Sequence, residues 1–207
     1  MPIAFSPLLV GFIVVTVLMV VVWIIHFLMK NAGVVDVFWG LGIVILTAIY
    51  FVHGIGYSRR KWMILSMVAI WGLRLSSHIL RRLLHEQQED SRYQRLRADW
   101  KTHVPFKFFL FFELQAVFQV ILSLPFFFVC TNPHPQIQWM EWMGLTVWLV
   151  GVIGETMADE QLKAFRTHPQ NKGKVCNIGL WHYSRHPNYF FEWLIWVGFA
   201  IFALGSC

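Results

Sequence analysis

The chain has 207 residues, of which 57% are hydrophobic, 17% are aromatic and only 14% are charged. A water-soluble domain of this size needs more charge to cover its surface, so the composition excludes that class. The formal net charge of +6 gives no reason to expect a nucleic-acid partner, because Lys and Arg in a membrane protein usually mark its topology.

Long uncharged runs predict an all-α, polytopic integral membrane protein. Several of them reach the roughly 20 residues that an α-helix needs to cross a bilayer. We expect a bundle of six transmembrane helices in a single domain, residues 1–207, with an extra N-terminal span over residues 1–32. The predicted spans are 7–29, 34–53, 62–82, 107–130, 140–159 and 188–205. The three cysteines show no CxxC spacing, so we predict neither a disulfide framework nor a metal site.

The distribution of positive charge predicts the orientation of the bundle. The first, third and fifth loops carry 13 of the 17 Lys and Arg residues. The positive-inside rule therefore places these loops in the cytoplasm and the N-terminus outside. The second loop, with Arg59, Arg60 and Lys61, disagrees with this assignment.

Polar residues gather at the predicted cytoplasmic ends of five spans. They are Asp36 on the second span, Arg74, His78 and Arg81 on one stripe of the third, Glu113 on the fourth, Glu155 and Asp159 on the fifth, and Asn188 and Glu192 on the sixth. An ionisable group in lipid costs at least about 2.5 kcal/mol, so such groups usually face a cavity or a partner. We interpret them as the lining of one polar cavity open to the cytoplasm.

Structural ion pairing is the alternative interpretation of the same residues. Arg74 would then pair with Asp36 or Glu155, and Arg166 with Glu192. Glu141 lies at the opposite membrane face between tryptophans, where we expect an interfacial carboxylate without a functional role.

Residues 179–192 combine basic side chains, a proline and the start of an apolar run. Pro187 favours the first turn of a helix, which would place Asn188 and Glu192 on one face. Arg185 beside the helix N-terminus suits a phosphate group, although basic residues and a proline also mark an ordinary entry into the membrane. Asp159 and Asn188 suit hydrogen bonds to a ribose or a nicotinamide, and a tyrosine or a carboxylic acid suits proton supply. Because no GxGxxG motif occurs, a Rossmann domain is not expected.

An ordered set of motifs extends this interpretation. The motifs are Val35-Asp-Val-Phe-Trp-Gly40, Trp71-Gly-Leu-Arg-Leu75, Glu89-Asp-Ser-Arg-Tyr93, Asp159-Glu-Gln-Leu-Lys-Ala-Phe-Arg166, Asn171-Lys-Gly-Lys174 and Ser184-Arg-His-Pro-Asn-Tyr-Phe190. Over residues 33–207 the chain resembles the DUF1295 family of bacterial membrane proteins. That family is similar to the C-terminal part of steroid 5-alpha-reductases.

The resemblance implies a seven-helix bundle that holds NADPH in a cytoplasm-facing cavity. It implies hydride transfer to an activated C=C bond of a lipophilic enone, steroid-like or isoprenoid. The residues that it assigns to the cofactor are Asp159, Arg166, Asn188 and Glu192, with Arg185 and Tyr189 from the same motif. The proton donor of the steroid reductases is a tyrosine assisted by a carboxylate, and Asp36 is our candidate for that carboxylate.

Two departures from the family pattern bear on activity. Phe191 stands where the family usually has glycine, and we expect it to narrow the approach to the cofactor. The chain stops at Cys207, before the seventh span and charged tail of the family pattern, so we expect an open cofactor site and weak activity. The alternatives are an S-adenosylmethionine-dependent membrane methyltransferase of the isoprenylcysteine type and a non-catalytic family member.

Overall fold

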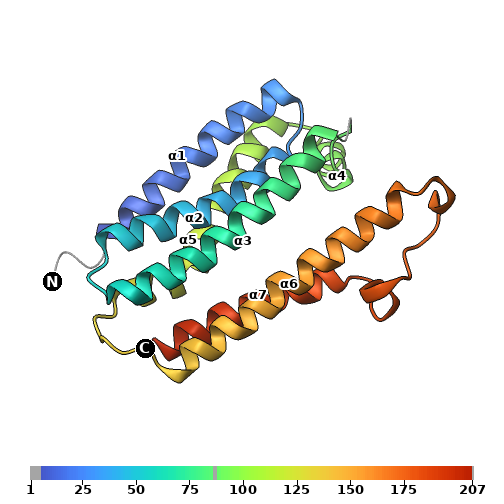
Figure 1. Ribbon diagram of the computed structural model, residues 1–207. Helices are drawn as coiled ribbons and strands as arrows, with labels where there is room; N and C mark the ends of the chain where they lie inside the picture. Colours follow the sequence, from blue (N-terminus) through green and yellow to red (C-terminus); the bar gives the residue numbers. More distant parts are fainter. Residues whose placement is uncertain (1–5, 86–87, 207) are drawn as a thin grey trace. The chain divides into compact units, whose positions relative to one another are not determined.

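The computed structural model describes residues 6–85 and 88–206. Within these ranges the protein contains seven α-helices, two short 3-10 helices and no strand, which confirms the all-helical class (Figure 1). The elements are α1 (Ser6–Met29), α2 (Val34–His53), α3 (Ser58–His85), α4 (Ser91–Trp100), α5 (Val104–Thr131), α6 (Trp139–Thr167), η1 (Pro169–Asn171), η2 (Gly179–His182) and α7 (Pro187–Gly205). They form two compact units, an N-terminal unit (Met1–His134) and a C-terminal unit (Pro135–Cys207).

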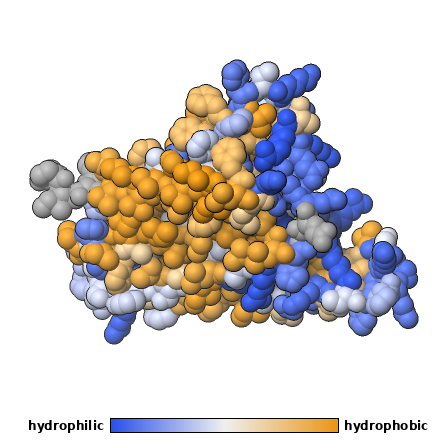
Figure 2. Space-filling view, turned by 90° about the horizontal axis from the view of Figure 1, so that it is seen from above, coloured by the Kyte–Doolittle hydropathy of each residue, from blue (hydrophilic) through white to orange (hydrophobic). Residues whose placement is uncertain are grey.

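Five helices of the described chain are long and apolar enough to cross a membrane: α1, α2, α3, α5 and α7. Their exposed side chains are largely apolar, and Figure 2 shows such side chains covering the helix flanks. The remaining predicted span, 140–159, lies within α6. This helix has 29 residues, but its second half is charged and it is not among the five. The third predicted loop, between the spans 62–82 and 107–130, contains the ten-residue helix α4.

Helix α2 forms the centre of the N-terminal unit, where it packs against α1, α3 and α5. Its inward side chains Ile43, Leu46 and Tyr50 are fully buried. The Tyr50 hydroxyl is hydrogen-bonded to the Ser123 hydroxyl of α5 at 3.0 Å. The buried hydroxyl of Tyr50 therefore has a partner within this largely apolar core, as the interior of a membrane bundle favours.

Two of the three cations of the second loop cap helix ends. Arg60 is 1% exposed and its guanidinium donates to the carbonyls of Asn132 and His134, just beyond α5, at 3.2 and 2.8 Å. The Lys61 ammonium donates to the carbonyls of Phe51 and Gly54, at the end of α2, at 3.0 and 2.8 Å. Cations at helix C-termini stabilise the exposed carbonyls and the helix dipole. These two charges therefore have a local structural role that accounts for their presence in the second loop.

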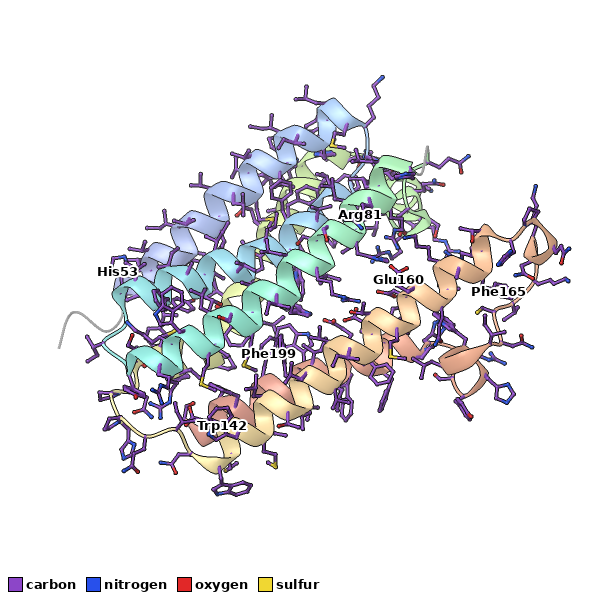
Figure 3. The ribbon with its side chains drawn as sticks, viewed as in Figure 1. His53, Arg81, Trp142, Glu160, Phe165 and Phe199 are labelled. Carbon is purple, nitrogen blue, oxygen red and sulfur yellow. The ribbon has the colours of Figure 1, made fainter. Side chains whose placement is uncertain are left out.

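The C-terminal unit is an antiparallel hairpin of α6 and α7 whose backbones approach closely at glycines. A Cβ atom at Gly198 of α7 would lie 2.6 Å from the backbone nitrogen of Trp148 in α6. A Cβ atom at Gly144 of α6 would lie 2.5 Å from the backbone nitrogen of Phe202. The hairpin also buries Phe199, whose ring centroid is 6.4 Å from that of Trp148 (Figure 3). Small residues allow membrane helices to pack by direct backbone contact.

Glu141 closes the end of this hairpin and is not an interfacial side chain. It is 0% exposed, which corrects the sequence interpretation. One carboxylate oxygen accepts from the backbone N–H of Gln138 at 2.7 Å, in the reciprocal arrangement of a capping box. The other accepts from the hydroxyl of Ser206 at 2.8 Å. A single carboxylate therefore joins the start of α6 to the end of α7.

We expect Gly198→Val to destabilise the protein by about 1–3 kcal/mol, because the added side chain would push α7 away from the α6 backbone. Thermal unfolding in detergent, followed by circular dichroism, measures the effect. Ala200→Val is the matched control, since Ala200 is exposed on the same helix. Equal unfolding temperatures for the two variants would contradict the close packing.

Candidate functional site

The first turn of α7 brings together two residues of the predicted cofactor site. Pro187 begins the helix, as the sequence predicts, and is buried. The Asn188 side-chain amide donates to a carboxylate oxygen of Asp159, on α6, at 3.5 Å. The amide oxygen of Asn188 is shielded from solvent and has no hydrogen-bond partner among the described residues. A shielded acceptor without a donor costs about 1–3 kcal/mol, so this oxygen is suited to a donor from a ligand.

The other predicted cofactor residues belong to the same C-terminal unit. Glu192 lies one turn after Asn188 and accepts from the indole N–H of Trp196 at 3.0 Å. Tyr189 is 67% exposed and stacks on His186 with ring centroids 5.1 Å apart. Arg166 and Arg185 are exposed, at the end of α6 and just before α7.

Three side chains that sequence reasoning did not single out hold the connection between α6 and α7 in place. The Gln161 amide oxygen accepts from the backbone N–H of Leu180 at 2.9 Å. The Trp181 indole donates to the carbonyl of Ala158 at 2.8 Å, and the Asn171 amide donates to the carbonyl of Phe165 at the same distance. Gln161 and Asn171 lie inside motifs noted in the sequence. Their role could not be read there because each bonds to the backbone of another element.

Phe191 packs against α6. A Cβ atom at Gly154 would lie 2.3 Å from two carbon atoms of the Phe191 ring, so the absence of a side chain at Gly154 makes room for this ring. The Phe191 ring is therefore matched by a glycine on the facing helix. The structure gives the ring a packing role in the hairpin, which the sequence did not predict.

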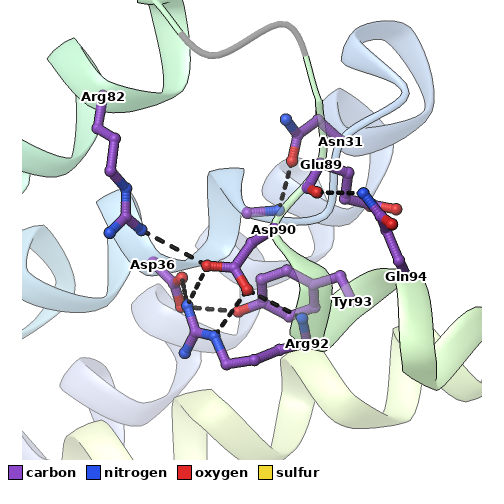
Figure 4. Close-up of polar contacts among 9 residues, drawn as sticks. Asn31, Asp36, Arg82, Glu89, Asp90, Arg92, Tyr93 and Gln94 are labelled. Atoms are coloured by element: carbon purple, nitrogen blue, oxygen red, sulfur yellow. Dashed lines mark hydrogen bonds and ion pairs between the residues drawn. The ribbon is translucent and has the colours of Figure 1, made fainter. Parts of the chain in front are cut away.

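Asp36 lies in a second polar group, in the N-terminal unit, which we call the carboxylate cluster (Figure 4). One oxygen of Asp36 accepts from the Tyr93 hydroxyl at 2.7 Å, and the other accepts from the Arg92 guanidinium at 2.9 Å. Tyr93 is 3% exposed. Asp36 thus has Arg92 as a cationic partner, whereas the pairing considered from the sequence was with Arg74.

The remaining carboxylates of the cluster attach α4 to the rest of the unit. Asp90 is the N-cap of α4, accepts from the Arg92 backbone N–H at 2.9 Å, and lies 3.7 Å from the Arg82 guanidinium. Glu89 accepts from the backbone N–H of Ala32, before α2, at 2.7 Å and from Arg97 at 2.9 Å. The motif Glu89–Tyr93 therefore docks α4 onto the turn between α1 and α2.

The electrostatics of this cluster shift two pKa values in opposite directions. The hydrogen bond from the Arg92 side chain, together with its charge, lowers the pKa of Asp90. Burial, followed by the negative charge of Asp36, raises the pKa of Tyr93. At neutral pH, Asp90 is therefore an anion and Tyr93 a protonated hydrogen-bond donor.

The residues proposed to line a cavity fall in both units. Arg74 is half-buried on α3, whereas His78 and Arg81 of the same stripe are exposed. Glu113 of α5 is half-buried, and Glu155 of α6 is 6% exposed.

A small pocket in the N-terminal unit adjoins Asp36. Its lining is Asn31, Gly33, Asp36, Ile79, Arg82, Leu83, Gln88 and Asp90. The single cavity predicted from the sequence stays a prediction.

We expect the attachment of α4 to weaken in acid. Because the pKa of Asp90 is lowered by folding, its contribution is complete above the ordinary aspartate pKa of about 3.9 and is lost as pH falls through the folded value. Amide hydrogen exchange, corrected for intrinsic rates, should become faster over residues 91–100 as pH falls below about 4. Asp90→Asn should show fast exchange at every pH, while Asp99→Asn, exposed on the same helix, should behave as wild type. A pH-independent wild-type profile would contradict this role.

Comparison with known proteins places the chain in a family. The model of the family described as "Protein of unknown function (DUF1295)" matches residues 22–207. An uncharacterized protein of Schizosaccharomyces pombe (strain 972 / ATCC 24843) is 25% identical over 224 residues, which cover 95% of this chain and 64% of that protein. The chain thus spans less than two thirds of this relative. No solved structure matches it. Since the family model covers most of the sequence, the chain belongs to the DUF1295 family.

Proposed function

We propose that this protein is a membrane-embedded reductase that uses NADPH to reduce an activated C=C bond in a lipophilic enone, steroid-like or isoprenoid. The observation that carries the proposal is the Asn188–Asp159 pair at the start of α7, with the shielded amide oxygen of Asn188 lacking a donor. The resemblance of the surrounding motifs to steroid 5-alpha-reductases indicates which ligand would supply that donor.

The chemistry of the C-terminal unit suits NADPH. The Asn188 amide oxygen can accept from a carboxamide N–H or a ribose hydroxyl, and Asp159 can accept from a second hydroxyl. Arg166 and Arg185 are exposed cations suited to phosphate groups, and a guanidinium can bind phosphate through two hydrogen bonds. The ring of Tyr189 is exposed and offers a flat surface for stacking. When bound, NADPH would supply the hydride.

The N-terminal unit contains our candidate for the carboxylate that assists proton supply. This candidate is Asp36, which accepts from the Tyr93 hydroxyl at 2.7 Å. Reduction adds a hydride to the β-carbon of the enone and a proton to the α-carbon of the resulting enolate, so the double bond becomes single. In the steroid reductases that the motifs resemble, a tyrosine supplies this proton.

The orientation of the chain follows from charge. Arg60 and Lys61 of the second loop bind helix-end carbonyls. The exposed cations are most numerous in two other segments, the loop that contains α4 and the connection between α6 and α7. We place these loops in the cytoplasm, where NADPH is available, and the N-terminus outside, in a bacterial inner membrane.

We expect the detergent-solubilised protein to bind NADPH saturably. Asn188→Ala and Asp159→Ala should each weaken that binding by about tenfold, because a hydrogen bond to a polar ligand contributes roughly 1–2 kcal/mol. Isothermal titration calorimetry measures the binding. Asn177→Ala, an exposed asparagine of the same unit, is the matched control. Binding of S-adenosylmethionine in place of NADPH would instead support a methyltransferase. Binding of neither would contradict an enzymatic role for this site.

A further inference from the structure

The connection between α6 and α7 exposes apolar side chains that a loop facing water would normally avoid. Val175 and Tyr183 are each 87% exposed, and Ile178 is 47% exposed. Nearby on α7, Tyr189 and Trp193 are 67% and 60% exposed. A cluster of exposed apolar and aromatic side chains usually marks a surface that contacts a membrane or a partner.

The backbone of this connection is fixed to α6. Gln161 binds the N–H of Leu180, the Trp181 indole binds the carbonyl of Ala158, and Asn171 binds the carbonyl of Phe165. These three hydrogen bonds make the connection a folded segment, so the direction of its outward side chains is set by its contacts with α6. The exposure of Val175, Ile178 and Tyr183 is therefore a property of the fold.

Positive charge is interleaved with these apolar side chains. Lys172, Lys174 and Arg185 are exposed on the same connection. Residues 161–191 contain no Asp or Glu, whereas the segment 83–103 carries both signs of charge. A surface with cations and no carboxylates complements an anionic partner.

The position of the connection in the chain identifies that partner. Helix α7 is long and apolar enough to cross a membrane and begins at Pro187, two residues after Arg185. Continuity of the chain therefore keeps Tyr183 and Arg185, which lie within four residues of Pro187, close to the level where α7 enters the lipid. Apolar side chains, tyrosines and lysines at that level suit the boundary between acyl chains and headgroups.

We propose that residues 172–186 form an anionic-lipid docking surface, in which Val175, Ile178 and Tyr183 insert into the headgroup region while Lys172 and Lys174 bind lipid phosphates. The proposal rests on the membrane class of the chain and does not depend on the proposed reductase activity.

Hydrogen exchange followed by mass spectrometry, on the full chain in lipid nanodiscs, tests this surface. We expect amides of residues 172–183 to exchange several-fold more slowly in discs of phosphatidylglycerol and phosphatidylcholine than in discs of phosphatidylcholine alone. The double variant Lys172→Gln/Lys174→Gln should lose this difference, and native mass spectrometry should show about tenfold weaker retention of phosphatidylglycerol. Lys101→Gln, an exposed lysine of the other charged loop, is the matched control.

A second variant separates insertion from charge. Val175→Asp should abolish the protection, whereas Ile55→Asp, at a residue 79% exposed in the second loop, should leave it intact. Equal exchange in the two disc types would overturn the proposal. Protection that appears in detergent with inorganic phosphate alone, or with an acidic soluble protein, would also overturn it and would reassign the surface to that ligand.

Discussion

Backbone hydrogen bonding in a medium without water is the constraint on which this structure depends. In lipid each N–H and C=O must find a partner within the protein, which helices provide everywhere except at their ends. The ends are where the chain places its ionic side chains. Arg60 and Lys61 bind carbonyls beyond α5 and α2, Glu141 binds an N–H at the start of α6, and Asp90 caps α4. These four charged side chains therefore complete helix ends.

The same constraint separates structural polar groups from those available to a ligand. Asp36, Glu89 and Asp90 have bound partners and attach α4 to its unit. Asn188 differs, because its amide donates to Asp159 while its shielded oxygen has no donor within the described chain. This difference makes the start of α7 the stronger candidate for a ligand site.

Close packing of α6 against α7 positions that candidate site. The hairpin is held by direct backbone contact at Gly198 and Gly144, and Gly154 receives the Phe191 ring. Because Asp159 lies on α6 and Asn188 on α7, their separation depends on this packing. The attachments of Gln161 and Asn171 extend the same order into the connecting segment, so the proposed cofactor contacts and the proposed lipid surface share one rigid support.

The sequence by itself determined the helical membrane class, the start of α7 at Pro187 and the sharing of one face by Asn188 and Glu192. These features depend on apolar run length and local periodicity, which neighbouring residues encode. Only the tertiary structure decided that Asp36 meets Tyr93, that Glu141 meets Ser206 and that Phe191 packs on Gly154. Helix periodicity states which face a residue occupies, but not which residue of a distant helix lies opposite it. That choice depends on the packing of the whole unit, which no local pattern contains.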